Sequence, residues 1–338
     1  MLKEEVLNGS NKRVVTRAPV HTVRLPGSVI ASLRCPVCGS ELSIVNSAVL
    51  CRSPGCGTEY PIVDGVPILL NQSNSIFAFS DFVERRSTYF PPASQFKRTL
   101  LKHIPTLSAN LRARENYKRF AELVLARGRN PVVLVVGGSV TGVGAEDLLG
   151  RSDIIFVESD VALGPRTTLV CDAHDLPFVE GMFDGVIVQA VLEHVLDPGK
   201  CVSEIHRVMK PGGVIYAETP FMQQLHGRQF DFTRFTLLGH RRLLRGFTEI
   251  ASGAAAGPGM ALAWSYQYFL LSFTERKNIR NALILFGRFT AFWLKYLDHF
   301  LLSRPAALDA ASAFYFLGVK AIAPLTDKEL VSQYRGGF

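Results

Sequence analysis

The sequence predicts an α/β fold in which a largely parallel sheet follows a small cysteine-rich module. An unbroken apolar run at residues 132–136 leads directly into a glycine-rich turn and then into a helical pattern. This order of strand, turn and helix is typical of a doubly wound parallel sheet. Further apolar runs of strand length follow at residues 153–157, 169–171, 183–188 and 214–220. Four of the six cysteines lie together nearer the amino terminus.

Length and composition indicate more than one folding unit. The chain has 338 residues, which exceeds the usual size of one domain. Its hydrophobic content of 48% and charged content of 20% are typical of a folded protein with a large core. The net charge of +8 would allow an anionic partner. Because the basic residues form no long run, we interpret the charge as that of a mildly basic enzyme.

Nothing in the sequence predicts secretion or a membrane span. Residues 1–30 mix charged side chains with short apolar pieces and lack the apolar core of a signal peptide. The best candidate spans, residues 260–273 and 282–294, are shorter than the ~18 residues that a spanning helix needs. We therefore expect a cytoplasmic protein, in which clustered cysteines bind metal more often than they form disulfides.

Two cysteine pairs, C-x2-C and C-x4-C, predict a zinc ribbon with a small hairpin between them. The four cysteines are Cys35, Cys38, Cys51 and Cys56. Such pairs can place four thiolates at the corners of the tetrahedron that zinc prefers, and Gly39 and Gly57 allow the tight turns. A closed set of four sulfurs leaves no position for water, so we expect a structural zinc site. The competing interpretation is a chance cluster of buried thiols.

The residues after this cluster resemble a known group of short zinc-ribbon domains. Residues 60–70 read YPIVDGVPILL, like the tail of small platform proteins that bind and activate tRNA and ribosome methyltransferases. The resemblance covers about residues 33–70 and implies a docking role for this module.

Residues 71–130 are predicted to form a linker and covering helices. Residues 71–80 are polar and then aromatic, and a helical pattern interrupted by prolines follows up to residue 129. Apolar side chains recur on one face of the last helix, between Leu111 and Val124. This face either packs on the next domain or covers a ligand cleft, and the pattern leaves both interpretations open.

The glycine-rich turn reads GGSVTGVG at residues 137–144. Such a turn lets a ligand approach the backbone at a helix amino terminus, but it suits nicotinamide, flavin and S-adenosylmethionine sites equally. Glu158 follows the second apolar run, and Asp160 comes two residues later. Either carboxylate could accept hydrogen bonds from ribose hydroxyls. We favour Glu158 because it follows the run directly.

Four motifs then occur in a fixed order: D-A-x-x-L-P-F at residues 172–178, F-D-x-V at 183–186, L-E-H at 192–194 and R-V-x-K-P-G-G at 207–213. In this order and spacing they resemble class I S-adenosylmethionine-dependent methyltransferases of the small-molecule type. The resemblance covers about residues 130–220. It implies a Rossmann-like sheet of seven strands with S-adenosylmethionine as cofactor.

The resemblance also implies which residues contact the cofactor. Asp172 would accept a hydrogen bond from the adenine amino group, with the Ala173 amide facing a ring nitrogen. Gln189 and Ala190 would lie along the methionine part. The complete predicted set is Gly137, Gly138, Ser139, Gly142, Glu158, Asp160, Asp172, Ala173, Gln189 and Ala190.

One departure from the family concerns the amino-acid end of the cofactor. The family commonly has an acid two residues before the first glycine, and here that residue is Val135. Ser139 stands where a second glycine is usual. The amino-acid end must therefore be held differently in this chain.

Three residues are candidates for catalysis: His226, His194 and Asp231. Methyl transfer is an in-line displacement at a carbon activated by sulfonium, so it needs alignment, and a base when the nucleophile is a hydroxyl. His226, Asp231 and Arg234 lie in an aromatic and polar segment after the fifth strand, near the expected cleft mouth. A structural role is the alternative for either histidine.

The carboxy-terminal part supplies the remaining strands and an insertion. Residues 239–247 predict a basic helix with a solvated face, and residues 247–250 and 314–319 predict the sixth and seventh strands. The intervening residues 257–310 are rich in aromatics and predict a helical insertion. Its helices either pack on the sheet or on a homodimer partner, or form an apolar pocket or membrane-surface patch for a lipid-linked substrate.

The predicted organisation is a flexible segment 1–32, a zinc ribbon 33–70, a linker with covering helices 71–130, a methyltransferase domain 131–325 and a tail 326–338. The expected acceptor is a small molecule or a glycan, including a lipid-linked sugar. An RNA or protein methyltransferase and a non-catalytic S-adenosylmethionine-binding protein are the alternatives. Nucleic-acid N-methylation is disfavoured, because residues 189–192 read QAVL and not the N/D-P-P-aromatic motif that grips an exocyclic amine.

Overall fold

The computed structural model describes residues 23–88 and 104–337. The strands in these residues are β1 (Leu42–Val45), β2 (Ala48–Cys51), β3 (Glu59–Val63), β4 (Val66–Leu69), β5 (Val132–Val136), β6 (Ile155–Asp160), β7 (Leu169–Cys171), β8 (Phe183–Gln189), β9 (Met209–Pro220), β10 (Phe247–Ala256) and β11 (Ala313–Lys320). They form one sheet in the order β1-β2-β3-β4-β7-β6-β5-β8-β9-β11-β10.

The centre of the sheet has the α/β arrangement that the sequence predicts. Strands β7, β6, β5, β8 and β9 run parallel, and β11 lies antiparallel between β9 and β10. The sequence predicts seven strands for the methyltransferase sheet, and the single sheet of the described residues has eleven. The four additional strands, β1 to β4, belong to the cysteine-rich module.

The module joins the sheet because β4 pairs in parallel with β7, placing Ile68 beside Val170 and Leu69 beside Cys171. The segment Val66–Leu69 is buried throughout, as a parallel strand covered on both faces must be. It also covers the edge of β7, which would otherwise expose unpaired backbone groups.

The first described residues are packed as well. Leu25 and Val29, the latter in the short helix α1 (Gly27–Ile30), are buried in the core that the module shares with the central strands. The Val179 amide donates to the Ser32 carbonyl at 3.0 Å. Residues 23–32 of the predicted flexible segment are therefore part of the fold, and residues 1–22 lie outside the described residues.

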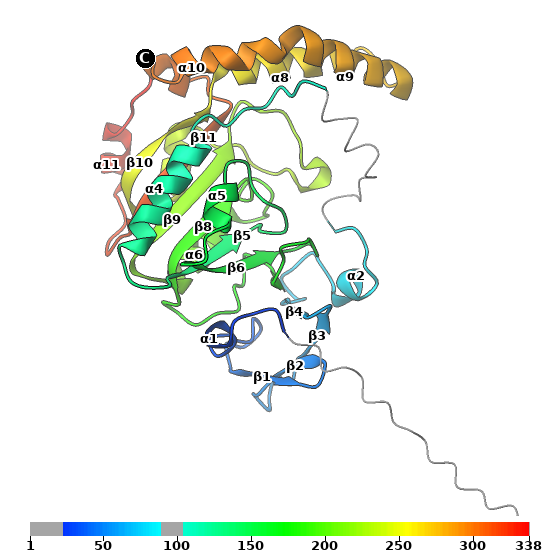
Figure 1. Cartoon of the computed structure of the whole chain (residues 1–338), viewed down its shortest axis with the longest axis vertical. Helices are drawn as coiled ribbons and strands as arrows, with labels where there is room; N and C mark the ends of the chain where they lie inside the picture. The colour runs from blue at the N-terminus through cyan, green and yellow to red at the C-terminus, as the bar shows by residue number, and fades with distance from the viewer. Residues whose placement is uncertain (1–22, 89–103, 338) are drawn as a thin grey trace, which may run out of the picture.

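Helices cover both faces of the central strands (Figure 1). Besides α1, the described residues before 258 form α2 (Phe79–Val83), α4 (Ala113–Leu125), α5 (Glu146–Leu149), α6 (Pro198–Val208), the 3-10 turn η1 (Arg228–Phe230) and α7 (Leu237–Leu243), and α11 (Asp327–Ser332) follows near the carboxyl end. Of these, α2 contacts β3 and α11 contacts α7. Side chains alternate along β5, so that Val133 and Val135 share a core with Phe120 of α4, while Leu134 shares one with Ile205 of α6. This alternation explains the unbroken apolar run.

Several strands extend beyond the predicted limits. β6 continues to Asp160, so Glu158 lies inside the strand and not at its end. β9 begins at Met209, directly after α6 ends, so its first residues include Gly212, whose φ is +68°. β10 continues to Ala256, six residues past the predicted limit of 250.

Residues 257–310 form a helical layer across one end of the sheet (Figure 1). Its elements are α8 (Pro258–Leu271), α9 (Lys277–Ala291), the 3-10 helix η2 (Phe292–Leu297), α10 (Asp298–Leu301) and the 3-10 helix η3 (Pro305–Leu308). Large apolar side chains face outward from this layer, including Leu262, Phe269, Phe273, Phe286, Phe289, Trp293 and Phe300. Within the described ranges, no helix has the length and apolar character that crossing a bilayer requires.

The predicted basic helix corresponds to α7, but two of its basic residues are not solvated. His240 and Arg241 are buried, with 2% and 5% of their surfaces exposed. The Arg241 guanidinium is 2.9 Å from a Glu249 carboxylate oxygen and donates to two backbone carbonyls, which allows its burial. Arg242 lies outside and pairs with Asp327 of α11, as a solvated face would.

Candidate cofactor cleft and metal centre

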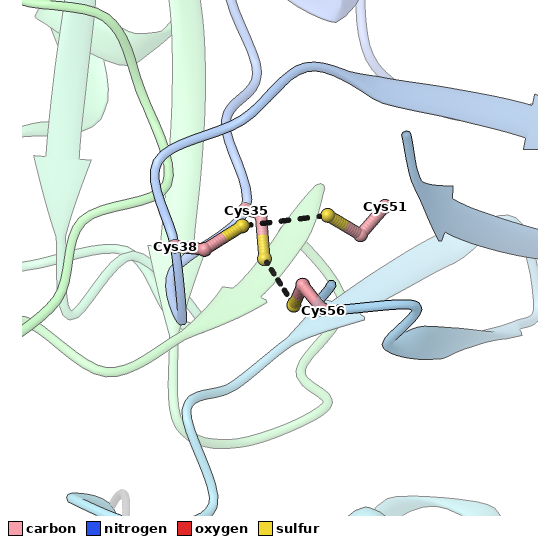
Figure 2. A group of neighbouring side chains, drawn as sticks. All are labelled: Cys35, Cys38, Cys51 and Cys56. Carbon is pink, nitrogen blue, oxygen red and sulfur yellow. Dashed lines mark hydrogen bonds between the residues drawn. The ribbon is translucent and has the colours of Figure 1, made fainter. Parts of the chain in front are cut away.

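The four predicted metal ligands converge in the amino-terminal module (Figure 2). The Sγ atoms of Cys35 and Cys56 are 3.8 Å apart, and those of Cys38 and Cys51 are 3.5 Å apart. All four sulfurs lie within 4.8 Å of one another. Zinc holds four sulfurs at ~2.3 Å, which places neighbouring sulfurs ~3.8 Å apart. The residues therefore fit a tetrahedral zinc ion.

The turns around this cluster are arranged for metal binding. Gly39 and Gly57 have φ values of +74° and +56°, in the left-handed region that glycine adopts without strain. Hydrogen bonds from Ser40 lower the pKa of the Cys38 thiol to about 6, whereas burial raises the pKa of the Cys51 thiol to about 12. A lowered pKa favours the thiolate, which is the form that binds metal.

Two adjoining cavities lie at the carboxyl ends of the central strands, and both are bordered by Val136, Gly137 and Ala190. The first cavity also has Asp160, Asp172, Ala173, Ile76 and Phe77 in its wall. The second cavity is bordered by Tyr117, Gln189, Glu193, Glu218 and His226. It encloses about 600 Å³, a size typical of small-molecule pockets. This edge of a parallel sheet is where α/β proteins bind ligands.

The glycine-rich turn needs its first glycine. Gly137 has a φ of +79°, and a Cβ there would lie 2.4 Å from Cγ2 of Val191. A Cβ at Gly142 would lie 2.0 Å from Oε1 of Gln189. Gly138 and Ser139 are not in the wall of either cavity, but the Ser139 amide donates to Asp160 at 2.9 Å and so ties the turn to β6.

The structure distinguishes the two acids of β6 and reverses our preference. Glu158 is buried, borders neither cavity, and its carboxylate binds the Arg166 guanidinium. Asp160, at the end of the strand, borders the first cavity. Burial raises the pKa of Asp160, and hydrogen bonds from the amides of residues 139, 161 and 162 oppose that rise. Asp160 is therefore the acid that a ligand in this cavity can reach.

Asp172 lies where the sequence predicts it, in the wall of the first cavity beside Ala173. Its Oδ2 accepts a hydrogen bond from the Ser75 hydroxyl at 2.7 Å, and its Oδ1 lies 2.5 Å from Nδ1 of His174. Burial alone would raise the pKa of Asp172, but the hydrogen bonds from His174 and Ser75 outweigh it and lower the pKa. The same contact raises the pKa of His174.

Glu218, at the end of β9, is a cleft residue that sequence reasoning missed. Its carboxylate is buried and accepts hydrogen bonds from the side chains of Asn110, Gln189 and Tyr216. Burial raises its pKa, and these donors oppose that rise. The signal that could have revealed it was an acid inside the fifth strand-length run, at residues 214–220.

The three predicted catalytic residues lie together. The rings of His194 and His226 are 4.9 Å apart between centroids, and Asp231 accepts the His226 amide at 2.7 Å. The Arg234 guanidinium holds the pKa of Asp231 well below its usual range despite partial burial. Burial lowers the pKa of His194; for His226 the neighbouring carboxylates of Glu193 and Asp231 outweigh burial and raise the pKa.

Comparison with known proteins gives this cleft a context. Residues 153–217, which run from just before β6 into β9, match a family described as a methyltransferase domain. This match covers 65 of the 338 residues of the chain.

Two curated relatives match parts of the chain. A ubiquinone biosynthesis O-methyltransferase of Pseudomonas paraeruginosa is 38% identical over 85 residues, which is 25% of this chain and 35% of that protein. A demethylmenaquinone methyltransferase of Clavibacter sepedonicus is 30% identical over 108 residues, which is 29% of this chain and 39% of that protein. The matches thus span little more than a third of the relatives' lengths.

A solved structure of phosphoethanolamine N-methyltransferase 2 from Haemonchus contortus in complex with S-adenosyl-L-methionine is also similar. It is 17% identical, with a TM-score of 0.41, and the similarity covers 78% of this chain and 62% of that one.

Segments before the methyltransferase domain cover its cleft. Ile76 and Phe77, from the stretch that the sequence predicted to be a linker, border the first cavity. Asn110, before α4, and Tyr117, in α4, border the second. Both interpretations left open for this region agree with the structure, because Phe120 and Val124 of α4 pack on the sheet while Asn110 and Tyr117 border the cavity. Residues 89–103 lie outside the described residues.

Proposed function

We propose that the protein transfers the methyl group of S-adenosylmethionine to a small molecule held in the second cavity. The observation that carries the proposal is the pair of cavities meeting at Gly137 of the glycine-rich turn and at Ala190, which lies in the stretch that matches a methyltransferase domain. One cavity has the side chains to hold an adenosine, and the other has room for a methionine moiety and an acceptor.

In the first cavity, each part of an adenosine would find a suitable partner. Asp160 would accept from the ribose hydroxyls, in place of Glu158, whose carboxylate is taken by Arg166. Asp172 and Ala173 would contact the adenine edge. The apolar side chains of Ile76 and Phe77 would cover the adenine face.

At the amino-acid end, Glu218 would replace the acid that is absent at Val135. Its buried carboxylate is held by neutral donors, and Gln189 and Gly142 lie beside it in the same cavity wall. A buried carboxylate surrounded by neutral groups is a favourable partner for an ammonium ion. We assign Glu218 to the ammonium of the methionine moiety.

The transfer itself follows from alignment in the second cavity. A lone pair on the acceptor oxygen or nitrogen forms a bond to the methyl carbon as the carbon–sulfur bond breaks, and the bonding pair stays on sulfur to give S-adenosylhomocysteine. A hydroxyl acceptor must also lose its proton. Neutral His226 borders this cavity and would take the proton, with Asp231 holding its backbone and His194 beside it.

The acceptor class rests on the relatives. Both act in quinone biosynthesis by name, and this supports a small organic acceptor over RNA or protein. The exposed aromatic layer of α8 and α9 supports a lipid-linked acceptor. Of the six Lys and Arg and two acids between residues 272 and 304, only Lys295 and Asp298 are buried, so five basic side chains and one acidic side chain reach the surface of this layer. We infer that this layer contacts an anionic lipid surface from which the acceptor enters. A glycan acceptor, a homodimer and a cytoplasmic location remain predictions.

The zinc ribbon would act as a structural part of the domain. Its four sulfurs fit zinc, and β4 completes the edge of the main sheet. The ribbon resembles platform proteins that activate methyltransferases, and its place beside the cleft fits this resemblance. The segment that follows the ribbon supplies Ile76 and Phe77 to the first cavity.

Radiolabelled S-adenosylmethionine tests the proposed function. The purified full chain is incubated with labelled cofactor and with separate lipid-soluble, water-soluble small-molecule, RNA and protein fractions of a cell extract. We expect label in a small-molecule fraction, most strongly the lipid-soluble one. Label only in RNA or only in protein would contradict the proposal, as would no transfer to any fraction.

A further inference from the structure

A buried carboxylate without a partner lies where the two cavities meet. Glu193 is 0% exposed, and within the described residues neither of its carboxylate oxygens has a hydrogen-bond partner. One of these oxygens is 3.6 Å from Nε2 of His194 and 3.7 Å from Nε2 of His226. Both separations are too long for hydrogen bonds. A buried carboxylate left in this state is strongly unfavourable, so the space between the three groups calls for an occupant.

The outer nitrogens of both imidazoles are directed at this space. Nδ1 of His194 is 2.8 Å from the Phe230 carbonyl oxygen and donates to it, and Nε2 is turned toward Glu193. Nδ1 of His226 faces the Gln224 carbonyl oxygen at 3.4 Å and Asp231 at 3.7 Å. Partners on the far nitrogen are the usual means by which proteins orient metal-binding histidines.

The electrostatics of the second cavity favour a cation. Glu193 and Glu218 are both buried carboxylates in its wall. Among the described residues that border this cavity, none is a lysine or an arginine. No lysine or arginine of the described cavity wall therefore balances these carboxylates.

We propose that Glu193, His194 and His226 bind one divalent transition-metal ion. Their ligand atoms all lie within 4.8 Å of one another. Nitrogen and oxygen ligands at ~2.1 Å from a metal lie ~3.0–3.5 Å apart, so the two measured separations need to shrink by only a few tenths of an ångström. Two imidazoles and one carboxylate suit Zn²⁺, Mn²⁺, Fe²⁺ or Co²⁺ better than Mg²⁺. Three protein ligands leave positions open toward the second cavity.

The ion has a consequence for the acceptor, and this consequence rests on the proposed function. An acceptor oxygen bound to the ion ionises at a lower pH than it does free in water. His226 then serves as a ligand and not as the base. Metal binding itself requires neither cofactor nor acceptor.

Titration of the full chain with Co²⁺ tests the site, because the cysteine cluster and the new site give different spectra. Cobalt bound by four thiolates absorbs in the near ultraviolet through sulfur-to-metal charge transfer, whereas cobalt bound by nitrogen and oxygen shows only weak visible bands. We expect two equivalents in the wild type. His226→Gln and Glu193→Gln should each weaken the second equivalent by about 100-fold or more and leave the sulfur signal unchanged.

His299→Gln is the matched control, because His299 is exposed in α10, outside the cleft, and should keep both equivalents. The retained sulfur signal shows that each variant is folded. A second readout is thermal unfolding, since bound Co²⁺ should raise the wild-type midpoint further than that of Glu193→Gln. A single equivalent in the wild type, or a second equivalent that persists in both variants, would overturn the proposal. Either result leaves S-adenosylmethionine binding untouched, because no cofactor is present.

Discussion

The Glu218 carboxylate lies in the second cavity with neutral donors around it, which makes it a sharp probe of how the cofactor is held. If it binds the ammonium of the methionine moiety, Glu218→Gln removes a charge-assisted hydrogen bond. Such a bond contributes about 1.5–3 kcal/mol. The variant should therefore bind S-adenosylhomocysteine about 10- to 100-fold more weakly, as measured by isothermal titration calorimetry.

The matched ligand for this experiment is 5′-methylthioadenosine, which lacks the amino-acid end. Its affinity should stay close to that of the wild type. Equal losses for both ligands would mean that the substitution disturbs the cavity as a whole, and Glu218 would lose its assigned role.

His240 predicts a pH dependence of stability. Burial, and then the charge of Arg241, lowers its pKa to about 3, from about 6.5 in an unfolded chain. Between these values the unfolded state binds more protons than the folded state, so stability falls as the pH drops below about 6.5. By pH 5 this group alone should cost about 2 kcal/mol. Urea unfolding at pH 5 and pH 7.5 should show a smaller difference for His240→Gln than for the wild type. An equal difference would refute the role of His240.

At this scale the motifs predicted residues that the structure places at the cleft, but they did not decide between Glu158 and Asp160. Asp172, Ala173 and Gln189 were placed by motif, and all three border the cavities. The choice between the acids depends on where β6 ends and on Arg166, whose guanidinium pairs with the Glu158 carboxylate. The apolar run at residues 153–157 predicts neither the end of the strand nor this ion pair. The burial of Glu193 is likewise a tertiary property.

The pairing of β4 with β7 makes the zinc ribbon part of the main sheet. We therefore expect the ribbon and the sheet to unfold together. Leu25, Val29 and Tyr60 belong to the same core as the central strands. Metal removal should therefore lower the unfolding temperature of the whole protein in one transition, as followed by differential scanning calorimetry with and without a strong chelator.

The response should persist in His226→Gln, which keeps the cysteine cluster, and should be mimicked by Cys38→Ser without chelator. Two separate transitions, with the upper one unchanged by chelator, would show that the ribbon unfolds independently of the sheet.

The outward face of α9 predicts membrane binding. Phe286 and Phe289 are 52% and 58% exposed. Replacing both with serine should abolish co-sedimentation of the protein with vesicles that contain anionic lipid, because the burial of apolar area and the attraction to anionic headgroups act together. Val331→Ser, an equally exposed site on α11, should have no effect.

Analytical ultracentrifugation without lipid separates this account from dimerisation. A wild-type dimer that the double substitution dissociates would assign the face to a second copy of the chain and contradict the lipid surface.

At the scale of elements, the sequence predicts the buried central strands, but it does not predict which strand pairs at the edge of the sheet. β5, β7 and β8 match their apolar runs closely because both faces of each strand are covered. The pairing of β4 with β7 joins residues about 100 positions apart and leaves no local pattern. The prediction of a fully solvated basic face on α7 was wrong for Arg241, because Glu249 on β10 pairs with Arg241 in the interior.

At the scale of the molecule, segments from distant parts of the chain build the cleft. Phe77 follows the ribbon, Asn110 and Tyr117 precede the first central strand, and Glu218 ends the fifth. The stretch that contains Phe77 has no periodicity, so its covering role could not be predicted from the sequence. The ribbon fixes where this stretch begins, which gives the module a structural reason to be fused to the domain.

Calorimetric titration with S-adenosylmethionine is the decisive experiment on whether this cleft binds the cofactor. We expect one molecule bound per chain. Asp160→Asn should weaken binding about tenfold or more, since it loses charge-assisted bonds to ribose, while Glu158→Gln should bind nearly as the wild type does. No binding at millimolar ligand would contradict the account, as would a loss with Glu158→Gln and none with Asp160→Asn.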